Sequence, residues 1–392
     1  MRRAAAAPLL AAILFAAFLL LSGEALAETS PQTDAELEEE LRRQLARIDL
    51  SPWEAYAGEI STLIGRSTDL GGLIEELALD GGSGLPESLP GAVKKLVSAE
   101  LRRSAAPVAA LTAAALLTAL AGMLGNGGTK PVLSLMLCAL PMTMTAAAAA
   151  SLAEGAFGAV AAARDIAEGS IPIMGTLLVS SGAGASAGVF RPLMGFLAGT
   201  VLSAVGSAAL PMALAAGLTG LVDPLTEGSR LKELTALFRR LVKWTLGLLS
   251  TLYLGVTAVS GMTAAARDGV AVRTAKYALD KLIPIVGSMV SGTVDSVMSC
   301  ALMLRSGIGA AGILILLAAL AGPLLRLAAG ALIFRVSAAL SAPAADERVV
   351  RLFSGAAETA SQLFACVAAA GCMLAVTGFV FIAGGGVTAG LW

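Results

Sequence analysis

The sequence predicts an all-α fold, that of a polytopic helical membrane protein with a small helical extracytoplasmic region near its N-terminus. Hydrophobic residues make up 57% of the 392 residues and charged residues only 14%, and the mean hydropathy is +0.82. Several apolar runs reach the ~20 residues that a helix needs to cross the hydrocarbon core of a bilayer. A pair of related strings later in the chain also predicts an internal duplication, which is common in polytopic membrane proteins.

Residues 1–27 are predicted to be a signal peptide. The chain starts with the basic Met1-Arg2-Arg3, continues with an apolar run up to Ser22, and has small residues around a cleavage position after Ala27. An uncleaved signal anchor is the alternative, because the apolar run is long. Either interpretation places Glu28 and the residues after it outside the cytoplasm.

Residues 28–103 are predicted to form the extracytoplasmic helical region. Leu37, Leu41, Leu45 and Ile48 follow one another at helical spacing, which indicates one apolar stripe. A second helix is expected after a cap at Asp49 or Ser51, with Pro52 in its first turn. Its Trp53 and Tyr56 are expected to pack on a helix face and not to contact a ligand. We expect this small region to be docked on a partner or on the membrane surface.

Residues 104–153 are predicted to be the first transmembrane hairpin. A basic amphipathic helix over residues 93–103 leads into a span over 105–124, and a tight turn at 125–130 leads into a second span over 131–152.

The duplication predicts two like membrane halves, residues 154–265 and 266–392. The string IPIMG begins at Ile171 and the string IPIVG begins at Ile283, 112 residues later, and the same offset aligns Pro211 with Pro323. The candidate broken-helix residues are those of the two strings and of the glycine-rich stretch after the first one: Pro172, Gly175, Gly182, Gly184, Pro284 and Gly287. Glycine and serine at this density favour close helix contact, a broken helix or a re-entrant segment over a plain span.

Charge placement favours one topology. Residues 230–243 and 346–352 are rich in Lys and Arg, which are enriched in cytoplasmic segments. Both lie in the cytoplasm if each IPIxG copy dips into the membrane and returns, and if residues 192–222 and 308–334 then cross it with a kink at Pro211 and a break at Pro323. The loop at 264–281 disagrees, because it lies outside despite four basic residues.

Reactive residue types are scarce. The chain has no histidine, which removes the usual general base and the Ser-His nucleophile pair. Its cysteines, Cys138, Cys300, Cys366 and Cys372, all lie in apolar segments, so we expect neither a disulfide framework nor a zinc site. We therefore predict no enzyme activity, no cofactor and no metal. Basic residues are not interleaved with aromatic ones, so no nucleic-acid partner is expected, and the basic segments are predicted to touch membrane lipid.

Asp295 is the main candidate for a pore-lining or intramembrane polar group. A carboxylate at membrane depth is costly unless it is paired or faces water. Asp295, with Thr293 and Ser296 near it, is interpreted either as a pore-lining or ion-coupling group or as the partner of Arg326 or Arg335. A position near the membrane interface is a further alternative. As a coupling group, Asp295 favours a small-solute secondary transporter. An intramembrane aspartyl protease needs a second carboxylate at matching depth, and the sequence offers none.

Several strings resemble the stage III sporulation protein AE family: IDLSPWEAYAGEI at 48–60, IPIMG and SSGAGASAGVFRPL within 171–193, and GVAVRTAKYALDKLIPIVGSMVSGTVDSV at 269–297. The resemblance covers nearly the whole mature chain. It implies a membrane component of a secretion-like channel complex that joins mother cell to forespore and is required for endospore formation. It also implies a location in the multi-pass mother-cell membrane facing the forespore during engulfment.

The same resemblance implies partners. They are other stage III sporulation operon proteins, including a secretion-type ATPase and ring-forming subunits, and indirectly the forespore stage II sporulation protein Q. The family has no catalytic residues to carry over to this sequence.

Overall fold

The computed structural model describes residues 35–64, 69–79, 88–124, 130–180, 184–223, 231–282 and 287–389. The predicted signal peptide, Gly182 and Pro284 lie outside these ranges. Every regular element within them is a helix and none is a strand, which confirms the predicted all-α class. Four short helices come first: α3 (Ala35–Leu45), α4 (Ser51–Glu54), α5 (Ala57–Ile64) and α6 (Leu70–Leu79). The longer elements are α7 (Ser88–Leu124), α8 (Lys130–Ser180), α9 (Gly184–Phe196), η1 (Leu197–Leu202), η2 (Val205–Ala209), α10 (Leu210–Val222), α11 (Lys232–Leu282), α12 (Gly287–Ser341) and α13 (Glu347–Ala389).

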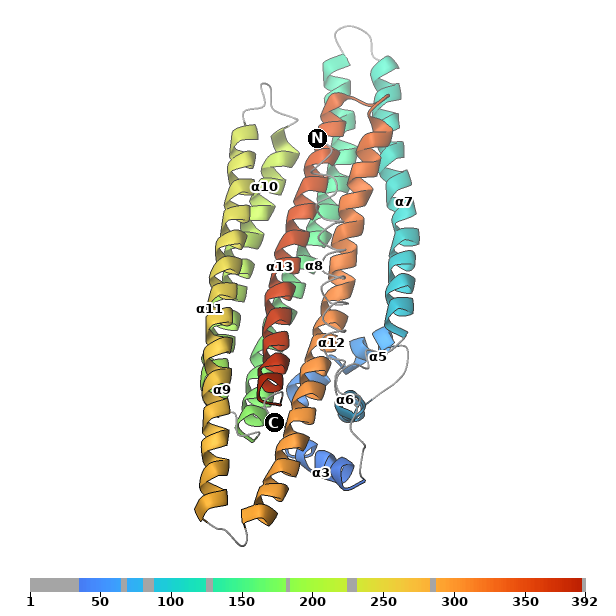
Figure 1. Ribbon diagram of the computed structural model, residues 1–392. Coiled ribbons are helices and arrows are strands. Elements are labelled where there is room, and N and C mark those ends of the chain that lie inside the picture. Colours follow the sequence, from blue (N-terminus) through green and yellow to red (C-terminus); the bar gives the residue numbers. More distant parts are fainter. Residues whose placement is uncertain are drawn as a thin grey trace.

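The long helices form one elongated bundle in which consecutive segments run in opposite directions (Figure 1). Helix α12 is central, since it contacts α6, α7, α8 and α13. Helix α11 lies at one edge of the bundle and α7 at the other (Figure 1). At 1.5 Å per residue, the 51 residues of α8 span about 76 Å. This is more than twice the hydrocarbon thickness of a bilayer, about 30 Å.

The described residues include five helical segments that are long and apolar enough to cross a membrane: Cys138–Val179, Ala187–Val222, Lys232–Val259, Cys300–Ser341 and Glu347–Ile382. A shorter apolar segment, Ala106–Thr118, lies in α7. The protein therefore has the helices of a multi-pass membrane protein, as its hydropathy predicts.

The N-terminal helices dock on the bundle of their own chain. Helix α6 crosses α12 at Gly307, where an added Cβ would lie 2.7 Å from the Ile74 carbonyl oxygen and 2.7 Å from the Ala78 Cβ. The Trp53 side chain is fully buried. Its ring would lie 3.1 Å from a Cβ added at Gly312 of α12. The expectation that Trp53 packs in the core is thus confirmed, and glycine is what lets these helices approach α12 so closely.

Tyr56 joins the same docked region to α8. Its hydroxyl donates a hydrogen bond to the carbonyl of Ala162, with an oxygen–oxygen distance of 3.4 Å. Burial raises the pKa of Tyr56, and the nearby carboxylates of Asp165 and Glu59 raise it further. The phenol consequently stays protonated at neutral pH and able to donate.

Pro172 and Gly175 do not break the helix, because α8 runs without interruption through both residues. Helix α8 ends at Ser180 and α9 begins at Gly184, at the glycine-rich stretch that follows the first IPIxG copy. Gly175 instead makes room for a side chain of the next helix: an added Cβ there would lie 2.8 Å from the Nε atom of Arg191 in α9. Gly184 is the first residue of α9 and Gly287 is the first residue of α12. The two IPIxG copies therefore occupy different places, one inside a helix and the other next to a helix start.

The two aligned prolines also differ. Pro211 follows two π-helical segments, η1 and η2, and stands at the start of α10. A proline cannot donate to the carbonyl four residues earlier, and wider π-type turns upstream are one way in which a helix accommodates this. The expected break at Pro323 is not found, since α12 is continuous from Gly287 to Ser341. Membrane helices tolerate proline where neighbouring helices satisfy the freed carbonyl.

The basic segments at 230–243 and 346–352 are not separate surface helices. Their described parts form the first turns of the long helices α11 and α13, except for the short connection before Glu347. Both starts lie at one end of the bundle, and α3 to α6 lie toward the other end (Figure 1).

The contact at Gly307 leads to a stability prediction. Gly307→Ala is expected to destabilise the protein by about 1–3 kcal/mol, because the new methyl group overpacks the α6 crossing. Gly322→Ala on the same helix is the matched control, since nothing lies within 4 Å of an added Cβ at Gly322. Denaturant unfolding of the detergent-solubilised protein, followed by circular dichroism, measures both. Equal stability of the two variants would contradict the docking of α6 at Gly307.

Candidate functional site

Asp295 lies in the first turns of α12, and its side chain and those of Thr293 and Ser296 are outside the described side chains. The continuous helix still shows how far Asp295 lies from Arg326 and Arg335, its candidate partners. Arg326 follows Asp295 by 31 residues on α12, about 46 Å along the axis. Arg335 is farther still. This separation along one helix is too long for either arginine to reach Asp295 within one chain. Arg326 is exposed.

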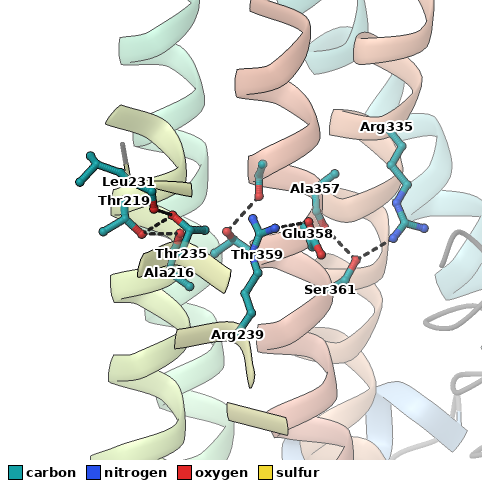
Figure 2. A network of polar contacts seen from close by, with 11 residues as sticks. Ala216, Thr219, Leu231, Thr235, Arg239, Arg335, Ala357, Glu358, Thr359 and Ser361 are labelled. Atoms are coloured by element: carbon teal, nitrogen blue, oxygen red, sulfur yellow. Dashed lines mark hydrogen bonds and ion pairs between the residues drawn. The ribbon is translucent and has the colours of Figure 1, made fainter. Parts of the chain in front are cut away.

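One network of polar side chains lies in a layer near the end of the bundle where α11 and α13 begin (Figure 2). We call this set the polar layer. It consists of side chains from four neighbouring helices, α10 to α13: Thr219, Thr235, Arg239, Arg335, Glu358 and Ser361.

The centre of the polar layer is an ion pair between α11 and α13. The Nη1 atom of Arg239 donates to the Oε2 atom of Glu358. The Arg239 side chain is only 19% exposed, while that of Glu358 is 52% exposed. The pair therefore lies at the boundary of the bundle, with the arginine turned inward. The Arg239 Nε atom is buried and has no hydrogen-bond partner among the described residues.

Hydroxyl groups extend the polar layer on both sides of the ion pair. The Thr235 hydroxyl donates to the Thr219 hydroxyl at 2.9 Å and so links α11 to α10. On the other side, Arg335 donates to the Ser361 hydroxyl at 3.1 Å and links α12 to α13. The hydroxyls of Thr219 and Ser361 each donate a hydrogen bond to the backbone carbonyl four residues earlier in their own helix. Each of these contacts satisfies a donor that lipid would leave unpaired.

Close backbone approach holds the polar layer together. An added Cβ at Gly217 of α10 would lie 2.7 Å from the Thr359 Cγ2 atom of α13. One turn later, an added Cβ at Gly355 would lie 3.5 Å from the carbonyl oxygen of Gly220. Both helices, α10 and α13, thus contribute glycine residues to their contact.

Two further buried polar contacts lie farther along the bundle. The hydroxyls of Tyr253 in α11 and Thr377 in α13 share a hydrogen bond, and both residues are almost fully buried. Arg305 of α12 is only 4% exposed, and its Nε atom donates to the Phe381 carbonyl at 2.7 Å. Its guanidinium carbon also lies 4.9 Å from the centre of the Phe381 ring, a cation–π distance.

The chemistry of these contacts is that of links between helices. Among the described residues, no group of three or more Cys, Asp and Glu side chains is placed to hold a metal ion. All four cysteines are free, and Cys138, Cys300 and Cys366 are buried.

Sequence reasoning did not single out the polar layer. Arg239 was expected only as part of a basic surface helix, and Glu358 and Tyr253 were not considered. One signal was available: Glu358 is the last charged residue before a charge-free stretch that runs from Thr359 to Ala389. A charge that borders a membrane-length apolar run is a candidate for pairing.

The ion pair predicts a measurable coupling between α11 and α13. In a double-mutant cycle of Arg239→Met and Glu358→Gln, we expect a coupling free energy on the order of 1 kcal/mol, because the pair is half-exposed. Arg240→Gln is the control, since Arg240 is exposed beside Arg239. The free energy of unfolding in detergent is the readout. Strictly additive effects of the two single substitutions would show that the pair contributes nothing.

Comparisons with known proteins agree with the family resemblance. The family model for stage III sporulation protein AE matches residues 69–385. The stage III sporulation protein AE of Bacillus subtilis (strain 168) is 30% identical over 218 residues, which cover 56% of this chain and 55% of that protein. The matched part is therefore about half the length of that relative. No solved structure matches the chain. Because the family model covers most of the chain, the protein belongs to the stage III sporulation protein AE family.

Proposed function

We propose that the protein is a non-enzymatic membrane component of a secretion-like channel complex that joins mother cell to forespore during endospore formation. The observation that carries the proposal is the family match over residues 69–385, which coincides with the membrane-length helices of the bundle. Membership of the family supports a role in sporulation. The contacts described above support a structural role in the membrane, because they link helices and assemble no reactive centre among the described residues.

The proposed location is the mother-cell membrane that faces the forespore during engulfment. The proposed partners are other stage III sporulation operon proteins. A secretion-type ATPase would meet the end of the bundle where α11 and α13 begin, and ring-forming extracytoplasmic subunits would meet the end with α3 to α6. Contact with the forespore stage II sporulation protein Q would be indirect. The exposed Lys243 and Arg240 near that first end suit anionic membrane lipid.

A small-solute secondary transporter is the second candidate. One observation favours it: Asp295 is the single charged residue in the sequence between Lys281 and Arg305. A carboxylate in such a stretch is a typical coupling group for an ion or a proton.

Deletion of the gene in the source organism, with complementation in trans, tests the proposed function. Cells without the protein are expected to complete engulfment but to lose late forespore gene expression and heat-resistant spores, since the channel complex would be incomplete. Copurification of the operon partners with the wild-type protein is the biochemical readout. Normal spore formation and late gene expression in the deletion strain would contradict the proposal.

Asp295→Asn separates the two candidates. The channel-component function predicts normal sporulation for this variant, because the substitution keeps the size of the side chain and removes only its charge. A coupling role predicts loss of function and loss of any flux in proteoliposomes, with Val297→Ala as the control in the same turns of α12. Loss of sporulation in Asp295→Asn alone would favour the transporter.

A further inference from the structure

The first turns of α7 carry a basic outer surface. Helix α7 lies at the edge of the bundle (Figure 1), and four of its residues are basic and exposed: Lys94, Lys95, Arg102 and Arg103. We call these four residues the basic face. All of them belong to one continuous helix. The two basic pairs are eight residues apart, about 12 Å along the helix axis.

Helical spacing puts both basic pairs on the same side of α7. Positions 94, 98 and 102 follow one another at intervals of four residues, and so do positions 95, 99 and 103, which keeps each set together along a helix. The residues between the pairs, Ser98 and Ala99, are small and exposed, so they leave the basic groups open to approach. Leu96 is half-buried and packs toward the bundle. The basic face therefore points away from the rest of the chain.

The described part of the chain supplies no counter-charge to the basic face. None of its four side chains forms an ion pair with a described carboxylate. Two other exposed basic residues of the N-terminal region are paired, since Arg42 contacts Glu75 and Arg43 contacts Glu39. Uncompensated positive charge at this end of the molecule is thus concentrated on α7.

The basic face lies on the side of the docked N-terminal helices. Leu96 packs against the core cluster that contains Ile60 of α5 and Leu73 of α6, and α7 contacts α5. The predicted signal peptide places these docked helices outside the cytoplasm. The residues from Ser104 to Leu124 carry no charge, and a stretch of this length suits a membrane span. The basic face thus stands between the docked helices and the first span.

Neither lipid tails nor the orientation of the span accounts for four cations in this place. Exposed ammonium and guanidinium groups are costly against hydrocarbon. Lys and Arg within about 15–20 residues of a span are enriched on the cytoplasmic side, and the basic face precedes the span on the other side. A cluster that opposes the usual distribution points to a partner of opposite charge.

Lipid headgroups cover only part of the basic face. The headgroup layer is about 5–8 Å thick on each side of the hydrocarbon core. Arg103 directly precedes the charge-free stretch and lies in that layer. Lys95 is eight residues earlier, about 12 Å farther along the helix, and stands beyond the layer. A protein surface covers both basic pairs at once, and acidic side chains are the ones that complement them.

We propose that the basic face of α7 docks an acidic surface of an extracytoplasmic partner protein. The inference rests on the proposed function, in which ring-forming subunits meet this end of the bundle, and it adds the surface and the chemistry of that contact. Complementary charges speed association and fix the orientation of the partner. Salt screens exposed charges, so the contact is expected to weaken as the ionic strength rises.

Charge reversal in the sporulating source organism tests the proposal. One tagged full-length variant combines Lys94→Glu with Lys95→Glu, and a second combines Arg102→Glu with Arg103→Glu. The readout is the amount of extracytoplasmic operon subunits that copurifies from solubilised membranes with an equal amount of the tagged protein.

Two controls accompany these variants. Arg43→Glu with Arg47→Glu makes the same change of charge at exposed residues in and directly after α3, at the same end of the molecule. Lys94→Arg with Lys95→Arg keeps the charge of the basic face. Both controls are expected to match the wild type.

Each reversal on α7 is expected to lower the copurified subunits at least about tenfold, because it turns attraction into repulsion. The wild-type complex is expected to lose subunits between about 0.1 M and about 1 M salt, since the Debye length falls from about 10 Å to about 3 Å. Undiminished copurification with both α7 variants would overturn the proposal. If the reversals instead remove bound anionic phospholipid and keep the subunits, the basic face binds headgroups and the proposal is equally wrong.

Carbodiimide crosslinking of the wild-type protein gives a second measurement that needs no variant. The reagent joins a lysine amine to a carboxylate in direct contact as an amide, with loss of one water. Mass spectrometry is expected to find Lys94 or Lys95 linked to an Asp or Glu of an operon subunit. Links of both lysines to carboxylates of this chain alone would contradict the proposed contact.

The deletion phenotype is independent of both readouts. Subunits retained by both α7 variants, together with loss of sporulation on deletion, would remove the docking surface and leave the proposed function in place.

Discussion

Close approach at glycine is the constraint on which this bundle depends. Two helices in lipid gain little from hiding apolar surface, because the surrounding hydrocarbon is as apolar as they are, so they associate through tight packing and hydrogen bonds. Gly330 lies against Leu152 of α8, Gly309 against Ile382 of α13, and Gly307 against α6. All three glycines belong to α12, and they let this helix pack closely against long helices and against the docked N-terminal region. The polar layer then adds directional contacts where helices already lie close.

The fold class and the existence of the long helices follow from the sequence, because membrane-length apolar runs leave few alternatives to helix. The packing of Trp53 also follows from its place on an apolar helix face. Helix ends were less predictable. Pro172 and Pro323 were predicted to interrupt their helices, but the helical backbone continues through both residues. A proline removes one backbone hydrogen bond, and neighbouring helices can compensate for its loss. Gly175 was predicted to lie in a broken helix, and it instead leaves room for the Arg191 side chain.

The polar contacts were harder to foresee for a different reason. Arg239 and Glu358 are 119 residues apart, and only the antiparallel placement of α11 and α13 brings them together. Arg305 contacts the backbone carbonyl and the aromatic ring of Phe381. The spacing of residues in the sequence does not predict partners of this kind. Asp295 attracted attention because it is isolated in the sequence. The continuous helix α12 has removed Arg326 and Arg335 as its partners within one chain.

Cryo-electron microscopy of the protein in lipid nanodiscs tests this account most directly. The account predicts direct contact between α12 and three other helices: α6 at Gly307, α13 at Gly309 and α8 at Gly330. Lipid density between α12 and these helices at the three glycines would contradict it.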